Sequence, residues 1–102
     1  MKLCKTTRPT RDDYWFYCPG CDEIHNFTIS PERGWKFDGN FETPTFNPSL
    51  LYIGKTPACH LFLHGGRIQY LNDCGHKLNG QTVDMVEIPA EYDWLWNPGT
   101  TI

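Results

Sequence analysis

Apolar and polar residues follow one another in short stretches along this chain. Nowhere do apolar residues recur at positions i, i+3, i+4 and i+7 over a full helical window. Eight prolines and nine glycines divide the chain into short pieces, a pattern that favours strands over long helices. Strands are expected over residues 14–17, 24–29, 35–37, 49–53 and 83–88. The pattern predicts a mainly β fold, a small antiparallel sheet with little or no helix.

The clearest predicted element is a central β-hairpin formed by residues 59–63 and 67–71. A Gly-Gly pair lies between the two segments, and it suits a tight two-residue primed turn. The resulting register places Leu63 opposite Ile68. Closing the hairpin therefore fixes which residues meet at its open end.

Two cysteines lie at that open end. In the predicted register Cys59 lies opposite Asn72, two residues before Cys74, so the two thiols should be close together. Adjacent residues of a strand point to opposite faces of the sheet. His60 is therefore expected on the face opposite to Cys59.

The length of the chain indicates one domain, residues 1–102, because a second could not bury a core of its own. Apolar residues make up 39% of the chain, below the usual share for a globular domain. Aromatic residues, at 15%, recover part of the missing burial. Small domains with such thin cores often gain stability from a metal or a disulfide.

Charge and hydropathy exclude several classes of partner. The formal net charge is -3 and no basic block is present, which argues against nucleic-acid binding. No stretch approaches the roughly 18 apolar residues of a membrane span, and the N-terminus lacks the apolar run of a signal peptide. A cytoplasmic location is expected, and in that reducing compartment five cysteines indicate metal binding or catalysis rather than disulfides.

Four of the cysteines fit a zinc site. The segment Cys18-Pro-Gly-Cys21 has the form of a zinc knuckle, whose tight turn aims both thiolates at one point. The hairpin supplies Cys59 and Cys74 as the second pair, and zinc takes four such ligands in a tetrahedron. We expect one structural Zn²⁺ per chain, which would tie together segments about 40 residues apart.

The same cysteines fit other roles. A CxxC pair can be a redox dithiol, although that version normally opens a helix in a βαβ unit, and the cysteines can also be plain core residues. A histidine, His25, His60 or His76, can replace one cysteine in a Cys₃His site. Cys4 lies in a charged N-terminal segment and is expected to be a free thiol.

Polar residues near these cysteines suggest hydrolytic chemistry. A serine nucleophile needs a neighbouring base, and the base needs an orienting partner. Ser49, one or more of the histidines, and Asp73 would meet that requirement if the fold brought them together. The alternative is structural: imidazoles near the metal or at the surface, a loop-capping serine and a turn aspartate.

The order and spacing of several segments resemble the BubE-like family, small proteins found in phage genomes and in bacterial ubiquitin-like (Bub) operons. Together these segments span residues 18 to about 84. The matching segments are Cys18-Pro19-Gly20-Cys21 with Glu23 and His25, residues 44–51, Cys59-His60, residues 66–71, residues 73–78 and residues 80–83.

The resemblance implies a zinc-binding peptidase that acts on ubiquitin-like proteins or their conjugates. The polar positions that correspond to the family pattern are His25, Ser49, His60, Asp73 and His76. In the expected mechanism His60 removes the proton of Ser49, and Asp73 or His76 orients the base. The attacked carbonyl would belong to the C-terminus of a ubiquitin-like partner.

One position departs from the family pattern. Asn47 occupies a position where family members often have serine, so the nucleophile is assigned to Ser49.

Two other functions fit the same residues. In a zinc metallopeptidase, His25, His60 and His76 would hold a second, open zinc that activates water. In a non-catalytic zinc-knuckle binding module of phage or bacterial origin, exposed Trp94 and Trp96 would contact a protein partner, because aromatic residues anchor interfaces. These tryptophans lie beyond the resembling segments and are otherwise expected to pack as a C-terminal lid.

Overall fold

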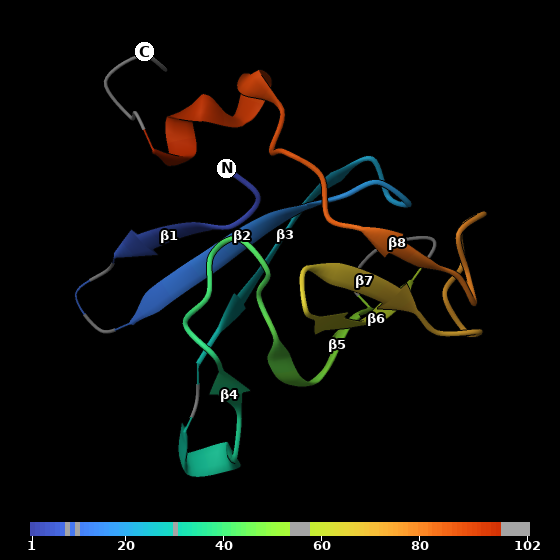
Figure 1. Cartoon of the computed structure of the whole chain (residues 1–102), viewed down its shortest axis with the longest axis horizontal. Helices are drawn as coiled ribbons and strands as arrows, with labels where there is room; N and C mark the ends of the chain where they lie inside the picture. Colours follow the sequence, from blue (N-terminus) through green and yellow to red (C-terminus); the bar gives the residue numbers. More distant parts are fainter. Residues whose placement is uncertain (8, 10, 30, 54–57, 97–102) are drawn as a thin grey trace.

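Two antiparallel β-sheets build the structure (Figure 1), a computed structural model that describes residues 1–7, 9, 11–29, 31–53 and 58–96. The first sheet has the strand order β1-β2-β3 and the second the order β4-β5-β6-β7-β8. The strands are β1 (Cys4–Thr7), β2 (Asp12–Cys18), β3 (Glu23–Thr28), β4 (Lys36–Phe37), β5 (Phe46–Tyr52), β6 (Cys59–His64), β7 (Arg67–Tyr70) and β8 (Thr82–Asp84).

The predicted mainly β fold is confirmed. The helical segments of the described residues are two short 3₁₀ turns, η1 (Pro31–Arg33) and η2 (Ala90–Leu95). The strands form two sheets where the sequence suggested one, because the chain leaves β3 through η1 and Gly34 (φ 77°) before β4 begins the second sheet. In the described part of the chain no helix is long and apolar enough to cross a membrane.

The segment predicted to be a zinc knuckle, residues 18–21, forms the turn between β2 and β3. Cys18 pairs with Glu23 across the two strands, and the Asp22 N–H donates to the Cys18 carbonyl at 2.8 Å. Asp22 adopts a left-handed conformation (φ 57°), which aspartate tolerates better than most residues. The buried residues of β2 alternate with more exposed ones, as expected for a strand with one face on the core.

The predicted hairpin is β6–β7, and its register is confirmed. Leu63 pairs with Ile68, and Leu61 pairs with Tyr70. Gly65 (φ 58°) and Gly66 (φ 81°) form the turn; positive φ at both central positions is the requirement of a primed turn.

Replacing Gly66 with alanine should lower the free energy of unfolding by about 2 kcal/mol or more, from left-handed strain and overpacking. A Cβ at this position would lie 3.0 Å from the Thr43 Cα, and the Thr43 N–H is held by a hydrogen bond to the Asn40 Oδ1. Gly65→Ala is the matched control, since a Cβ there meets nothing within 4 Å. Denaturant unfolding measures both variants; equal losses would contradict the close-approach argument.

The core lies where the inner faces of the two sheets meet. Phe16 and Phe27 of the first sheet and Phe46, Leu61 and Tyr70 of the second belong to one buried cluster. Phe27 and Phe46 join the sheets directly, with ring centroids 4.5 Å apart. The cysteines of the knuckle and the hairpin belong to the same cluster, so the metal-ligating candidates lie between the sheets.

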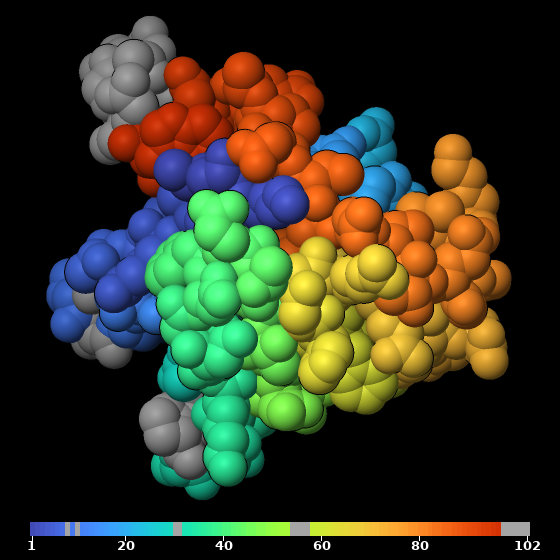
Figure 2. All heavy atoms as spheres, in the orientation of Figure 1, coloured from blue at the N-terminus to red at the C-terminus, as the bar shows by residue number. Residues whose placement is uncertain are grey.

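The C-terminal segment differs in part from its prediction. The strand expected over residues 83–88 is β8, which ends at Asp84, because Met85 and Ile88 turn inward and are buried. The Ile88 N–H donates to the Met1 carbonyl at 2.9 Å. Through this contact the chain passes from the second sheet to the first, and the C-terminal segment lies beside the N-terminal residues (Figure 2).

The buried side chain of the C-terminal turn η2 is Leu95, which clusters with Cys4 and Ile88. Trp94 packs edge-on against Trp15 with ring centroids 6.2 Å apart. Trp94 and Trp96 both keep about two fifths of their surface exposed, 42% and 39%. The lid is thus anchored by a leucine, and its tryptophans lie at the surface.

Candidate active site and metal centre

The strand that carries Ser49 is distorted at that point. Phe46 pairs with Leu63 and Leu50 pairs with Leu61, so residues 47–49 of β5 lie opposite the single residue Phe62. Pro48 explains the bulge, since it has no N–H to donate to the ladder and prolines in strands are confined to edges and bulges. Bulges often lie next to functional sites, where they change the direction of a side chain.

Ser49 and His60 face each other across β5 and β6. Leu51 is paired with His60, and Ser49 lies two residues before Leu51 on the same face. The Ser49 Oγ is 3.0 Å from the His60 Nε2. As predicted from strand alternation, His60 lies on the face opposite to Cys59, which is buried in the core.

Asp73 completes the arrangement from the turn that follows β7. The Leu71 N–H donates to the His60 carbonyl at 3.0 Å, and the Cys74 N–H donates to the Leu71 carbonyl at 3.1 Å. This tight turn brings the Asp73 carboxylate to the imidazole, with Oδ2 3.0 Å and Oδ1 3.2 Å from the His60 Nδ1.

The carboxylate determines the direction of these hydrogen bonds. An ionised carboxylate only accepts, so the His60 Nδ1–H donates to Asp73 and the Nε2 is left to accept the Ser49 O–H. The Asp73 side chain is 65% exposed and the His60 side chain 22%. The three groups therefore lie at the surface of the sheet, within reach of a macromolecular substrate. Hydroxyl, imidazole and carboxylate have the hydrogen-bonded order found in serine hydrolases.

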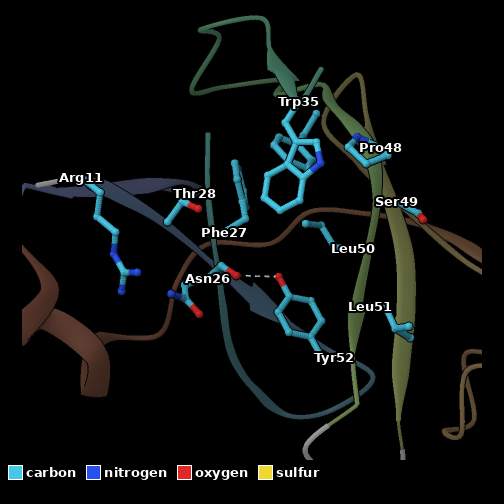
Figure 3. Close-up of a pocket in the computed structure, with 11 residues that line it drawn as sticks. Arg11, Asn26, Phe27, Thr28, Trp35, Pro48, Ser49, Leu50, Leu51 and Tyr52 are labelled. Carbon is cyan, nitrogen blue, oxygen red and sulfur yellow. Dashed lines mark hydrogen bonds between the residues drawn. The ribbon is translucent and has the colours of Figure 1, made fainter. Parts of the chain in front are cut away.

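Two hollows adjoin this site. The larger, about 410 Å³, lies between β3 and β5 and includes Ser49 in its wall. Figure 3 shows the Ser49 hydroxyl on the opposite side of β5 from Leu50 and Tyr52, which line the hollow. The smaller hollow is about 180 Å³ and contains the carboxamide residues Asn47 and Gln69.

Cysteine and histidine side chains gather on the inner side of the same sheet. Two groups have ligand atoms that all lie within 4.8 Å of one another, and Cys59 belongs to both. The first group is Cys18, Cys21, His25 and Cys59, and the second is Cys59, Cys74 and His76. All four predicted cysteines thus fall in clusters positioned to bind a metal ion.

The spacing of the sulfurs fits a tetrahedral metal. The Cys59 Sγ lies 3.9 Å from the Cys18 Sγ and 3.6 Å from the Cys74 Sγ. Four sulfurs bound to zinc at 2.3 Å in a tetrahedron would be about 3.8 Å apart. All five cysteines are free thiols, and Cys21 is the most exposed of the four in these clusters. The thiol donors and these two spacings match those of a zinc site, while Cys74 lies outside the cluster of Cys18 and Cys21.

The knuckle is prepared for a thiolate. The Cys21 N–H donates to the Cys18 Sγ at 3.4 Å, and the Tyr70 hydroxyl lies 3.0 Å from the same sulfur. The hydrogen bond from Cys59 lowers the pKa of Cys18, and the Tyr70 hydroxyl acts in the same direction. Metal binding requires the deprotonated thiol, so this environment favours the ligating form.

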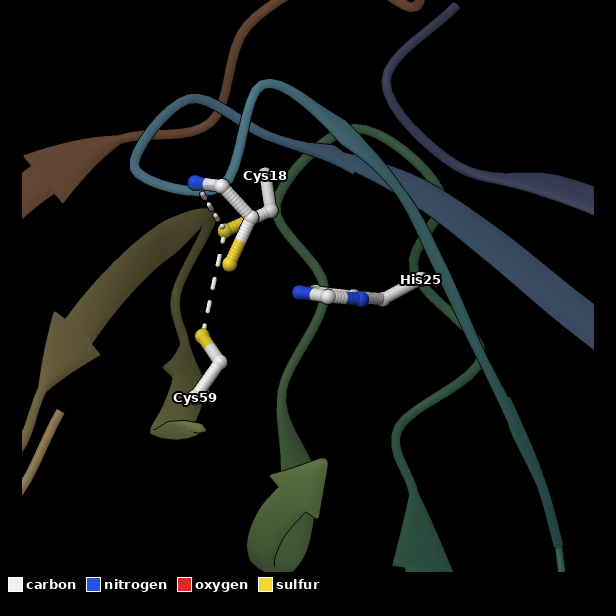
Figure 4. Close-up of side chains that lie close together, drawn as sticks. Cys18, His25 and Cys59 are labelled. Atoms are coloured by element: carbon white, nitrogen blue, oxygen red, sulfur yellow. Dashed lines mark hydrogen bonds between the residues drawn. The ribbon is translucent and has the colours of Figure 1, made fainter. Parts of the chain in front are cut away.

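His25 is buried between the sheets beside these sulfurs (Figure 4). Its ring stacks on Tyr52 with centroids 4.0 Å apart and an interplanar angle of 10°. Its Nε2 is buried with no hydrogen-bond partner, a costly condition that a bound metal or a protonated thiol would relieve. The structure places His25 in the cluster with Cys18, Cys21 and Cys59.

His76 also lies with the cysteines. Its Nε2 is 3.1 Å from the Cys74 Sγ and 3.6 Å from the Cys59 Sγ, whereas Asp73 is the residue that contacts His60. His25 and His76 fall in different cysteine clusters, and His60 belongs to neither. In the described residues the three histidines do not converge as the metallopeptidase hypothesis requires.

Two pairs of adjacent residues connect the cysteine clusters with the site of Ser49. Cys59 and Cys74 lie in the metal clusters, while their neighbours His60 and Asp73 meet on the opposite face of the sheet. Sequence reasoning missed Tyr70, whose hydroxyl contacts the knuckle sulfur. The hairpin register carried that signal, because a residue opposite Leu61 lies on the inner face.

Comparison with known families agrees with this type of site. Residues 2–71 match the family described as bacterial ubiquitination-like system serine protease (BubE). The chain belongs to this family, which confirms the resemblance drawn from its motifs. The match contains Ser49 and His60 and ends before Asp73 and Cys74. Neither the curated proteins nor the solved structures hold a significant match.

Proposed function

We propose that this chain is a serine peptidase that cleaves ubiquitin-like proteins or their conjugates. The observation that carries the proposal is the continuous hydrogen-bonded series from Ser49 through His60 to Asp73. The family description, a serine protease of a bacterial ubiquitination-like system, supports both the nucleophile and the class of substrate.

In the proposed reaction the Ser49 Oγ attacks the carbonyl carbon while its proton passes to the His60 Nε2. Asp73 holds the Nδ1–H and stabilises the imidazolium that forms. The imidazolium then gives its proton to the departing amine or alcohol, leaving an ester on Ser49. A water molecule, deprotonated by His60, hydrolyses this ester and releases a carboxylate.

The tetrahedral intermediate needs hydrogen-bond donors for its oxyanion. Two carboxamide side chains, those of Asn47 and Gln69, line the smaller hollow. We assign the donor role to Asn47, which lies two residues before the nucleophile. An asparagine at this position would thereby serve the reaction without being the nucleophile.

The metal centre is proposed to hold one structural Zn²⁺, with Cys18, Cys21, Cys59 and Cys74 as ligands. His25 and His76 are the residues close enough to replace one cysteine. A zinc ion with four protein ligands has no open position for water, so its contribution is the stability of the scaffold. The bond-breaking steps belong to Ser49, His60 and Asp73.

Labelling with a fluorophosphonate tests the activated nucleophile. We expect one phosphonyl group per wild-type chain, located at Ser49 by peptide mass spectrometry, because the reagent requires a serine deprotonated by a neighbouring base. His60→Ala should abolish the labelling. Ser30→Ala is the matched control, because Ser30 is the other serine of the sequence. Labelling that survives Ser49→Ala or His60→Ala contradicts the proposal.

The rival function, a non-catalytic binding module, rests on the exposed Trp94 and Trp96. It predicts a folded, metal-loaded chain that binds a ubiquitin-like protein without cleaving it and does not react with the fluorophosphonate. Trp94→Ala and Trp96→Ala would then weaken binding, whereas Ser49→Ala would leave it unchanged.

A further inference from the structure

The larger hollow lies between two sheet edges. One wall is residues 26–28 of β3, the last strand of the first sheet, and the other is residues 48–52 of β5. The floor is formed by aromatic and aliphatic side chains, Phe27, Trp35, Leu50 and Tyr52 among them (Figure 3). The volume of about 410 Å³ is large enough for more than one side chain.

The edge of β5 is free along this hollow. β4 pairs only with Phe46 and Asn47, and among the described residues no other strand covers β5 on that side. In an antiparallel ladder every second residue directs its N–H and C=O away from its partner strand. Within residues 49–52 those groups therefore point from β6 toward the open edge.

The edge of β3 is closed at one point. The Tyr52 hydroxyl donates to the Asn26 carbonyl at 2.9 Å and bridges the two walls. At the opposite end β4 blocks the edge next to Pro48. A chain lying along β5 must therefore leave the edge near Ser49.

We propose that this hollow is the substrate-binding groove, in which an extended peptide segment next to the scissile bond pairs with the free edge of β5. Alternate apolar side chains of the peptide enter the aromatic floor between β3 and β5. The inference rests on the proposed function, because the wall of the groove contains Ser49. Main-chain pairing gives affinity in such strand addition, and the pockets for alternate side chains give specificity.

The lining determines what the groove accepts. Its floor is apolar, and its charged residue, Arg11, is paired with Asp13 at 3.2 Å. Burying an unpaired charge is costly, so the inward-facing positions of the peptide should be aliphatic or aromatic.

Binding is tested apart from cleavage with ¹⁵N-labelled, metal-loaded Ser49→Ala chain. The probe is acetyl-Thr-Leu-Thr-Leu-Thr-Leu-amide, titrated while amide resonances are recorded. We expect shifts of the amides of residues 26–28 and 49–52 and of the Trp35 indole. Shifts confined to other strands, or no binding, would overturn the groove.

Two N-methylated forms of the probe test strand pairing. One carries methyl groups on the odd amides and the other on the even amides. Because every second residue of the peptide pairs with β5, one form should lose binding by at least about tenfold relative to the other. Equal affinities of both forms would overturn the pairing.

Filling the groove separates this inference from the proposed function. Thr28→Trp places an indole at the wall of the hollow, which Thr28 lines, and Thr82→Trp, on an exposed position of β8, is the matched control. With a fluorogenic version of the probe we expect Thr28→Trp to raise KM by at least about tenfold and Thr82→Trp to leave it unchanged. An unchanged KM in Thr28→Trp would contradict the proposal that this hollow binds the substrate. If the wild-type chain hydrolyses neither the probe nor p-nitrophenyl acetate, the proposed function is contradicted. The binding titration then still tests whether the hollow binds the peptide.

Discussion

Replacing Ser49 with alanine is expected to lower kcat by about 10⁶-fold, the effect of removing the nucleophile from a serine peptidase. The residual rate should exceed that of the uncatalysed reaction only by the contribution of substrate binding. The substrate to use is a ubiquitin-like protein with a C-terminal fusion, and the measurement is the rate of release of the fused segment.

Asp73→Asn is expected to cause a smaller loss of kcat in the same assay. An asparagine can present its N–H₂ to the His60 Nδ1 and so favour the wrong tautomer, and an analogous change costs about 10⁴-fold in kcat elsewhere. Asp73 is 65% exposed, so stability should change little. His76→Ala is expected to affect metal content more than kcat, because His76 contacts Cys74 rather than His60.

Measurements of folding and of zinc content serve as controls for these variants. Circular dichroism and zinc content of Ser49→Ala should equal those of the wild-type chain, and Ser30→Ala should retain full activity. A Ser49→Ala chain that is folded and cleaves at the wild-type rate would remove Ser49 from the mechanism.

Removal of the metal is expected to unfold the chain. Structural zinc contributes about 10–16 kcal/mol in small zinc domains, which is comparable to the whole stability of about 5–15 kcal/mol of an ordinary domain. The wild-type chain should contain one zinc, and Cys18→Ser or a strong chelator should abolish both the metal and the cooperative thermal transition.

Cys4→Ala is the matched control for the metal. Cys4 is buried with Ile88 and Leu95 and belongs to neither metal cluster, so its replacement should lower stability modestly and leave one zinc per chain. Elemental analysis and thermal unfolding measure both variants. A chain that stays folded without metal would contradict the structural role.

The metal should also hold the catalytic geometry. Cys59 and Cys74 are adjacent to His60 and Asp73, so strands released from the metal would separate the imidazole from its carboxylate. The low-field proton resonance of the His60 Nδ1–H reports this contact without any turnover. We expect the resonance to be lost in proportion to the metal removed, together with the far-ultraviolet circular dichroism signal.

Much of the local structure follows from local residue chemistry. Pro and Gly spacing excluded long helices, and the Gly-Gly pair fixed the register that places Leu63 opposite Ile68. The same register predicted that Cys59 and Cys74 would meet, and their sulfurs are 3.6 Å apart. These outcomes depend on contacts close in sequence, where turn geometry leaves few alternatives.

Other features escaped sequence reasoning because they depend on distant segments. β1 has no recognisable alternation of its own and exists because β2 offers it an edge. The strand expected to reach residue 88 ends at Asp84, since Met85 and Ile88 bury their side chains instead. The division into two sheets likewise follows from where the chain turns after β3.

The amino-acid sequence by itself determined the class of fold, the family and the set of chemically capable residues, among them four cysteines, three histidines, one serine and one aspartate. It also separated Cys59 from His60, because neighbouring residues in a strand point to opposite faces. Only the tertiary structure decided how the histidines are divided. The bulge at Pro48 and the turn after β7 bring Ser49 and Asp73 to His60 on one face, while the packing of the two sheets encloses His25 and His76 with the sulfurs on the other. Both outcomes depend on contacts between segments far apart in the chain, which the spacing of residues along one strand does not specify.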